Sequence, residues 1–432
     1  MGRKKHVQKL KVYLEKQKIG FLTRRTDGSI EFRYDDEWID TGYAISLSLP
    51  LPDRVFIGER ASFYFDNLLP DSTKIIEAIA QKFAASSTKS FDILAAVGRE
   101  CAGALSFFHE EEDPELTDKM QVRLLSDSDI AHRLRGLSSD SPLGMDDGDF
   151  RLSLAGAQEK MALLYRKGKW WEPRGATPTS HILKRSMGTL MKNATVEAID
   201  FQTSVDNEWI SLYLARACDI SAAKADIAIF EDQRILSVER FDRVWKENIL
   251  RRIPQEDFCQ ATGTSPFLKY ERKGGPSLRK MMTILLSSNN ATADRRRFFK
   301  TALFNDLIHN TDSHAKNFSI FQLRAGFALT PMYDLLSAHF IYKTHSDLYS
   351  NLRSSLSVNG KEKFHEITAD DWRKEADHCG LGKKICDELM HELALAVKSL
   401  DVPIKAQPSD LDKHQVESIL EGIQRRARIL LG

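Results

Sequence analysis

The chain has 432 residues, of which 62 are basic and 61 acidic, so its formal net charge is only +1. This balance predicts no global attraction to nucleic acid, although a local basic face would escape the count. No apolar run is long enough to cross a membrane, and the basic N-terminus lacks the apolar core and cleavage site of a secretory signal. The length predicts two or three domains or lobes.

Five cysteines are dispersed along the chain without a Cys-x-x-Cys pair: Cys101, Cys218, Cys259, Cys379 and Cys386. An odd number of scattered cysteines is typical of reduced thiols in a cytosol. We therefore expect a cytoplasmic protein whose cysteines fill the core.

The first part of the chain predicts a β-rich unit over residues 1–110. Residues 7–33 have the pattern of a hairpin with an Asp-Gly turn. The pattern from about 60 to 100 is helical, and residues 100–108 look like a strand that closes the unit.

A second unit is predicted over residues 111–250, with a loop rich in Gly, Ser and Asp at 136–150. Three strand-like runs then predict a meander, a helical pattern follows, and two more strands complete the unit. The runs lie at 160–166, 169–173, 179–185, 196–220, 225–232 and 235–244.

The last part, residues 251–432, is mostly helical apart from a hairpin over 318–334. Two β-rich units followed by a long helical unit have the order of a two-lobed kinase with an N-terminal extension. We expect an α+β, kinase-like fold with a mixed N-terminal lobe, an extra subdomain and an all-α C-terminal lobe.

Polar and metal-binding side chains are concentrated in residues 304–320, FNDLIHNTDSHAKNFSI. Asp312 and Asn317 are five residues apart, the step that protein kinases use between the catalytic-loop Asp and a metal-binding Asn. One loop can then present the carboxylate to a hydroxyl and the amide to a metal, while Lys316 steadies the phosphate. The alternative for the pair is a loop-forming role.

A second carboxylate with a kinase-like position is Asp334, which ends a strand-like run in Tyr333-Asp334-Leu335. There is no Asp-Phe-Gly here, and a turn or helix cap is the alternative. Lys184 ends another strand-like run and could meet a phosphate. Glu208, twenty-four residues later, could orient this lysine, but Asp206 is almost as well placed.

Two further segments suit a nucleotide. Residues 153–160, SLAGAQEK, contain small residues that allow a phosphate close to the backbone, although the segment is neither a GxGxxG nor a Walker loop. Residues 235–244, ILSVERFDRV, precede the helical part, where a kinase links its lobes and offers backbone groups to adenine. A tight turn and an ordinary strand are the alternatives.

A metal-dependent hydrolase is the competing interpretation, with His309, Asp312, His314 and Asp334 as ligands of Zn²⁺ or Mn²⁺. It leaves the Ala-Gly-Ala loop, Lys184 and Asn317 without a role, whereas a kinase uses all of them in chain order. The ordered set therefore favours phosphoryl transfer.

With these residues the sequence resembles the HipA family of bacterial serine/threonine kinase toxins over roughly residues 10–340. The segments that carry the resemblance are SFYFDNLLPD, VGRECAGALSFF, RLSLAGAQEKMALL, TPTSHILK, SVDNEWISLYLA, VERFDR, RIPQEDFCQATG, KYE, NTDSHAKNFSIF and LTPMYDLLSA. Residues 345–432 are only loosely similar.

The resemblance implies ATP and Mg²⁺ as cofactors and Asp312 as the catalytic base. Asn317 and Asp334 would bind Mg²⁺, and Ser153 would be autophosphorylated, which would add about −2 charge and pull its loop out of the cleft. The implied nucleotide contacts are Ala155, Gly156, Ala157, Gln158, Glu159, Lys160, Lys184, Glu239, Arg240, Phe241, His314, Lys316, Asn317, Tyr333 and Asp334.

The resemblance also implies a toxin that phosphorylates a translation component, with glutamyl-tRNA synthetase as the best-known substrate, and so causes growth arrest and multidrug tolerance. Its partner would be a HipB-like, DNA-binding antitoxin dimer with which it represses its operon, in the bacterial cytoplasm. The sequence leaves open a nucleotide-binding regulatory module that transfers no phosphate.

Overall fold

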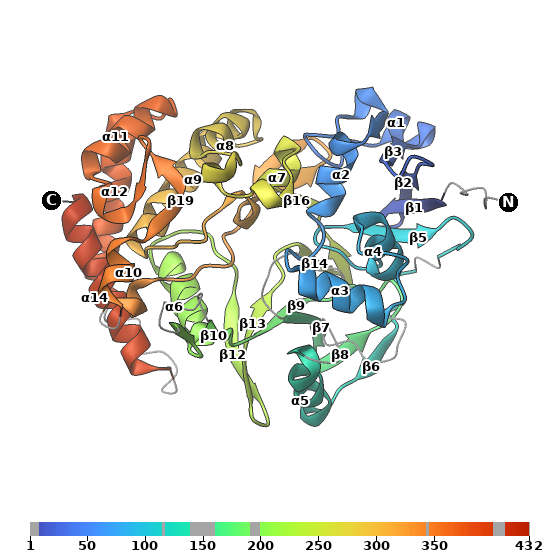
Figure 1. Cartoon of the computed structure of the whole chain (residues 1–432), viewed down its shortest axis with the longest axis horizontal. Helices are drawn as coiled ribbons and strands as arrows, with labels where there is room; N and C mark the ends of the chain where they lie inside the picture. The colour runs from blue at the N-terminus through green and yellow to red at the C-terminus, as the bar shows by residue number, and fades with distance from the viewer. Residues whose placement is uncertain are drawn as a thin grey trace.

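The computed structural model describes residues 8–114, 117–138, 160–190, 199–342, 345–400 and 411–431. Its two ends lie far apart: a blue N-terminal unit and orange-to-red C-terminal helices flank a green central sheet (Figure 1). Within the described ranges, no helix has the length and apolar character needed to span a membrane.

The N-terminal unit is an antiparallel five-stranded sheet with the order β4-β3-β2-β1-β5. Alternate residues of β1 are buried, as one apolar face of a sheet requires. The strands are β1 (Gln8–Leu14), β2 (Gln17–Arg24), β3 (Ile30–Tyr34), β4 (Val55–Ile57) and β5 (Leu105–His109). Its main helices are α1 (Asp36–Thr41), α2 (Glu59–Asp66), α3 (Thr73–Lys82) and α4 (Ser90–Val97).

The strand predicted over residues 100–108 begins only at Leu105, so that prediction was wrong at its start. Residues 100–103 form a loop in which Gly103 has a φ of +72°. A Cβ atom at Gly103 would lie 3.0 Å from the Gln255 carbonyl oxygen, so glycine permits this close approach to the C-terminal part of the chain.

The central sheet has six strands in the order β12-β13-β9-β7-β8-β6. β9 lies beside β7 and not beside β8, so the predicted meander was wrong. Five consecutive residues of β7 are buried, which requires that both faces of the sheet are covered at this strand. The strands are β6 (Val122–Leu124), β7 (Lys160–Arg166), β8 (Lys169–Pro173), β9 (His181–Arg185), β12 (Ala225–Phe230) and β13 (Gln233–Glu239).

Two helices cover opposite faces of the central sheet. α5 (Asp127–Arg135) packs in the cluster that contains Ile235, whereas α6 (Ser204–Ala217) packs in the cluster that contains Leu236. Adjacent residues of a strand point to opposite faces, so the sheet is buried on both sides.

The C-terminal part shares its largest core with α6 and is helical apart from two small sheets. The predicted hairpin is present as β17 and β18, with β16 beside it, and a second hairpin of β19 and β20 was not expected. The helices include α7 (Phe258–Thr262), α8 (Leu278–Ile284), α9 (Ala291–Leu307), α10 (Ser346–Ser350), α11 (Ala369–His378), α12 (Lys383–Lys398) and α14 (Lys413–Leu431). The remaining strands are β10 (Gly188–Leu190), β11 (Ile199–Phe201), β14 (Arg243–Lys246), β15 (Ile249–Arg252), β16 (Gln255–Asp257), β17 (Ser319–Leu323), β18 (Gly326–Leu329), β19 (Arg353–Val358) and β20 (Lys361–Lys363).

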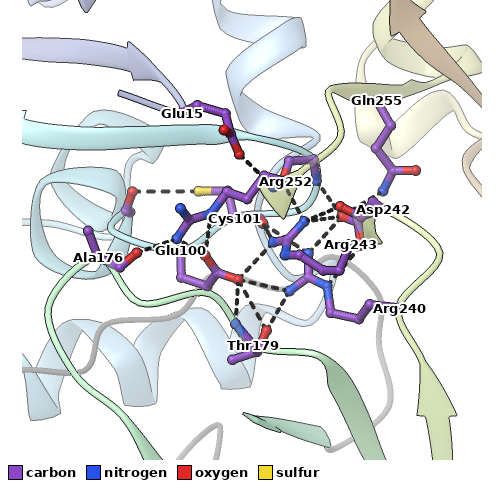
Figure 2. Close-up of polar contacts among 12 residues, drawn as sticks. Glu15, Glu100, Cys101, Ala176, Thr179, Arg240, Asp242, Arg243, Arg252 and Gln255 are labelled. Carbon is purple, nitrogen blue, oxygen red and sulfur yellow. Dashed lines mark hydrogen bonds and ion pairs between the residues drawn. The ribbon is translucent and has the colours of Figure 1, made fainter. Parts of the chain in front are cut away.

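A buried ionic cluster joins the N-terminal unit to the central sheet (Figure 2). We call it the interface cluster, and its members are Glu100, Arg240, Asp242, Arg243 and Arg252. Glu100 is fully buried and accepts hydrogen bonds from all three arginines, at 2.5–3.3 Å. Burial alone would raise the pKa of Glu100, but the arginines outweigh burial and keep that pKa low.

Asp242 completes the cluster. It accepts hydrogen bonds from Arg240 at 2.7 and 2.9 Å and from the backbone N–H of Gly103 at 2.8 Å. Thr179, just before β9, donates its hydroxyl to Glu100 at 3.1 Å. One carboxylate of the N-terminal unit thus binds both the strand that carries Lys184 and the segment after β13.

A neutral contact lies nearby at Glu256 of β16, whose carboxyl accepts a hydrogen bond from the backbone N–H of Leu47 at 3.0 Å and another from Gln322. Burial raises the pKa of Glu256 to about 8 from an ordinary value of 4.5. Since the folded state then binds the proton more tightly than the unfolded state, this carboxyl stabilises the fold most below pH 4.5 and progressively less up to pH 8.

Replacing Glu256 with Gln should therefore change the pH dependence of stability. The wild type should lose up to about 1.4 kcal/mol per pH unit from this group across that window. We expect Glu256→Gln to unfold at a higher temperature than the wild type at pH 8, with the gap closing towards pH 5, in thermal scans of both proteins. A gap independent of pH would show that Glu256 does not titrate in this range.

Candidate active site

A cleft with a cavity volume of about 170 Å³ lies beside the central sheet and the residues after α9. Its lining contains every described residue that the resemblance to a kinase assigns to the nucleotide or to catalysis: Lys160, Lys184, Glu239, Arg240, Phe241, Asp312, His314, Lys316, Asn317, Tyr333 and Asp334. Ser153, Ala155, Gly156, Ala157, Gln158 and Glu159 lie outside the described residues.

Lys184 is the centre of a buried ionic triad. From β9 its ammonium donates to Glu208 of α6 at 2.6 Å and to Asp334 at 2.6 Å. Burial opposes the charge on Lys184, but the two carboxylates outweigh burial and raise its pKa. Asp206 pairs with Arg234 at 2.5 Å, so the choice left open by the sequence falls on Glu208.

Asp334 has a φ of +60°, a left-handed conformation that is uncommon outside glycine and is concentrated at functional sites. Lys184 and Lys160 outweigh the effect of burial and hold the pKa of Asp334 low. Burial in turn lowers the pKa of Lys160 to about 8. Asp334 is therefore an ionised carboxylate that is bonded to Lys184 and lies within the electrostatic influence of Lys160.

Tyr333 connects three parts of the cleft. Its hydroxyl donates to the backbone oxygen of Lys316 at 2.8 Å and lies 2.6 Å from the Ser319 hydroxyl. Its ring centre is 5.4 Å from that of Phe241. Tyr333 thus packs the segment after β13 against the loop that follows α9.

That loop presents Asp312 with its side chain half exposed, at 49% of full exposure. The Asn317 amide nitrogen donates to the Asp312 backbone oxygen at 2.7 Å and so closes the loop. Tyr270 donates its hydroxyl to the Asp312 carboxylate at 2.5 Å. A carboxylate that binds a hydroxyl in this way has the geometry required of a general base.

His314 is buried in the same loop, with its ring 5.0 Å from the Tyr270 ring and nearly perpendicular to it. Burial lowers the pKa of His314, so the ring is neutral. Neither ring nitrogen has a hydrogen-bond partner among the described residues. Buried polar atoms without a partner at the wall of a cleft suit a site that binds a polar ligand.

The structure does not support the hydrolase interpretation. His309 is not among the residues that line the cleft, and its ring stacks on Phe364 with 4.3 Å between ring centres. Across the described part of the chain, no three His, Cys, Asp or Glu side chains converge as metal ligands.

Sequence patterns assigned no role to Asp71 and Lys269, which line the cleft, or to Tyr270, which contacts Asp312. Asp71 bonds Lys316 across 245 sequence positions. No spacing rule connects residues so far apart. The segments DNLLPD and KYE, which contain them, were the only available signal.

Comparison with known proteins agrees with this geometry. The family model of the HipA-like C-terminal domain matches residues 152–400, and the family model of the HipA N-terminal domain matches residues 10–108. The chain belongs to the HipA family. Membership of this family and the kinase-like site both indicate that the chain is a protein kinase.

Individual relatives cover nearly the whole chain. "Putative kinase Y4mE" of Sinorhizobium fredii is 29% identical, over 98% of this chain and 99% of its own length. The serine/threonine-protein kinase toxin HipA of Shewanella oneidensis is 28% identical, over 86% of this chain and 83% of its own length. The solved complex of HipA, HipB and operator DNA from Shewanella oneidensis MR-1 has a TM-score of 0.81 at 25% identity and covers 98% of this chain and 97% of that one.

The triad yields a prediction for HipA-type phosphoryl transfer. Glu208→Gln should weaken the hold on Lys184 and lower kcat/KM for ATP by about tenfold or more, because a misplaced lysine binds phosphate less well. Asp206→Asn is the matched control, since it removes a carboxylate from the same helix that does not touch Lys184. Equal kinase rates for the two variants would contradict a role for the Glu208 contact.

Proposed function

We propose that this HipA-family kinase transfers the γ-phosphate of ATP to a serine or threonine hydroxyl of a protein. The observation that carries the proposal is the convergence of Lys184, Glu208, Asp312, Asn317 and Asp334 in one cleft, in the order along the chain that a kinase requires. Each residue has a role that its contacts support.

Asp312 accepts the proton of the attacking hydroxyl. Its half-exposed carboxylate already accepts a hydrogen bond from the Tyr270 hydroxyl, which supports this role. Lys184 binds the nucleotide phosphates, and Glu208 holds its ammonium in place. Lys316 and the neutral His314 line the same wall and contact the nucleotide.

The residues present also fit a magnesium ion. Asp334 is an ionised carboxylate, and Asn317 uses its amide nitrogen for the loop, which leaves the amide oxygen for a cation. Carboxylate and carbonyl oxygens are the ligands that Mg²⁺ prefers. When bound, the ion would neutralise phosphate charge.

The biological role we propose is that of the toxin of a toxin–antitoxin pair. The fold similarity to a HipA, HipB and operator DNA complex supports a HipB-like antitoxin partner and operator DNA reached through that partner. We propose that its substrate is a translation component, such as glutamyl-tRNA synthetase, and that phosphorylation of this substrate leads to growth arrest and persistence. We also propose that phosphorylation of Ser153 inactivates the kinase itself.

Intact-mass spectrometry before and after addition of Mg·ATP tests the chemistry. The wild type should gain one phosphate that maps to Ser153, or carry it already, whereas Asp312→Asn and Asp334→Ala should gain none because the base or the metal ligand is missing. Ser153→Ala is the control for the modified position. Wild-type protein that starts and ends without phosphate would favour a regulatory module that transfers nothing.

Expression in bacteria tests the biological role. The wild type should arrest growth when produced alone, and a co-produced HipB-like partner should restore growth. Asp312→Asn at matched protein level should not arrest growth, since the arrest requires phosphoryl transfer. Equal arrest by wild type and Asp312→Asn would separate toxicity from kinase activity.

A further inference from the structure

A carboxylate of the N-terminal unit enters the cleft at Asp71, between α2 and α3. One carboxylate oxygen accepts a hydrogen bond from Lys316 at 2.6 Å, and the other accepts one from Lys269 at 2.7 Å. Burial alone would raise the pKa of Asp71, but the two lysines outweigh burial and lower it to about 2. Asp71 is therefore a carboxylate with one lysine on each oxygen.

These lysines belong to the two segments that hold the catalytic base. Lys316 lies in the short helix η7 (Ala315–Asn317), and Lys269 directly precedes Tyr270, which bonds Asp312. The two segments also meet directly, since the Ala315 N–H donates to the Lys269 backbone oxygen at 3.2 Å. Asp71 closes the same junction from the side of the N-terminal unit.

Asp71 is one of several contacts that dock the N-terminal unit. Ser48 donates its hydroxyl to the Gln260 backbone oxygen at 2.7 Å, and Asn67 donates to the Thr264 backbone oxygen at 2.9 Å. The interface cluster provides a further buried connection (Figure 2). Because these other contacts also dock the unit, the side chain of Asp71 can act mainly on the two lysines of the active site.

We propose that Asp71 is a positioning residue for phosphoryl transfer, which holds Lys316 and Lys269 so that the loop of Asp312 keeps its reactive geometry. The proposal rests on the kinase function given above. Without this carboxylate the two ammonium groups repel each other across the position it occupied, and Lys316 loses its fixed direction. A displacement of about 1 Å in such a site costs on the order of 100-fold in rate.

The charge of Asp71 distinguishes this role from a structural one. Asp71→Asn removes a negative charge from a cleft that receives an anionic nucleotide, so MgATP should bind as well as before or more tightly. The rate of phosphoryl transfer should fall because the loop is no longer held. A merely structural defect would lower the rate and the binding together.

The experiment measures the kinase rate, as kcat and the KM for ATP, with a peptide or Ser153 as the phosphate acceptor. Calorimetry gives the affinity for MgATP, and a thermal scan gives the melting temperature. The variants are Asp71→Asn, Asp71→Glu, Lys316→Met and the double variant Asp71→Asn/Lys316→Met. Asp92→Asn is the matched control, because Asp92 is a buried carboxylate of the same unit that pairs with Arg24 at 2.6 Å, away from the cleft.

We expect kcat of Asp71→Asn to fall by about tenfold or more without weaker MgATP binding, and Asp71→Glu to recover part of it. The losses in the double variant should be clearly less than additive, because Asp71 acts in part through that lysine. Asp92→Asn should lower the melting temperature and leave kcat unchanged. If Asp71→Asn does not fold, Asp71→Glu in the wild-type and Lys316→Met backgrounds supplies the same comparison.

Three results would overturn the role of Asp71. They are an unchanged kcat in Asp71→Asn, additive losses in the double variant, and a joint loss of kcat and MgATP binding. An inactive wild type would instead refute the proposed function and remove the basis of the inference. The two failures are thus separated by the wild-type rate.

Discussion

The arrangement of the cleft depends on the carboxylate of Glu100. Three guanidinium groups from residues 240–252 converge on one side chain of the N-terminal unit, which is fully buried. Isolated burial of any of these charges would cost several kcal/mol, so the segments are stable only together. The interface cluster therefore acts as a constraint that sets the N-terminal unit, the start of β9 and the segment after β13 in one geometry.

That constraint explains why the active site extends beyond a kinase core. β9 follows Thr179, which contacts Glu100 and Arg240 of the interface cluster, and carries Lys184 of the triad. The lysine strand is thus held at its start by the cluster and at Lys184 by carboxylates. The loop of Asp312 has a comparable arrangement, with Tyr333 on one side and Asp71 on the other. Both halves of the cleft are thus held in part by a carboxylate of the N-terminal unit, Glu100 on one side and Asp71 on the other.

Short-range rules were sufficient for the parts of the site that one segment presents. Asp312 and Asn317 share a loop, and Lys184 lies on a strand before the next long helix, so their order along the chain pointed to them as a set. The choice between Glu208 and Asp206 required the structure, since both are buried on α6 and only their partners differ. Strand order in the central sheet was not predictable either, because tertiary burial and not local propensity places β9 beside β7.

Long-range contacts were outside the reach of sequence patterns. The loop at residues 100–103 looks strand-like from its apolar and small residues, yet the ionic partners of Glu100 lie 140 or more positions away. Asp71 presents the same difficulty, because a single acidic residue after a proline has no local feature that separates it from a turn. What decides both is the docking of two units, which no single segment encodes.

The stoichiometry of the interface cluster has a further electrostatic consequence. Within the cluster three guanidinium groups pair with the carboxylates of Glu100 and Asp242, and one of the three, Arg240, lines the cleft itself. A charge in the protein interior is poorly screened by dissolved ions, whereas exposed lysines lose their attraction within a Debye length of about 10 Å at 0.1 M salt. The attraction between this buried charge and a nucleotide already seated in the cleft should therefore weaken less with added salt than a contact with an exposed lysine would.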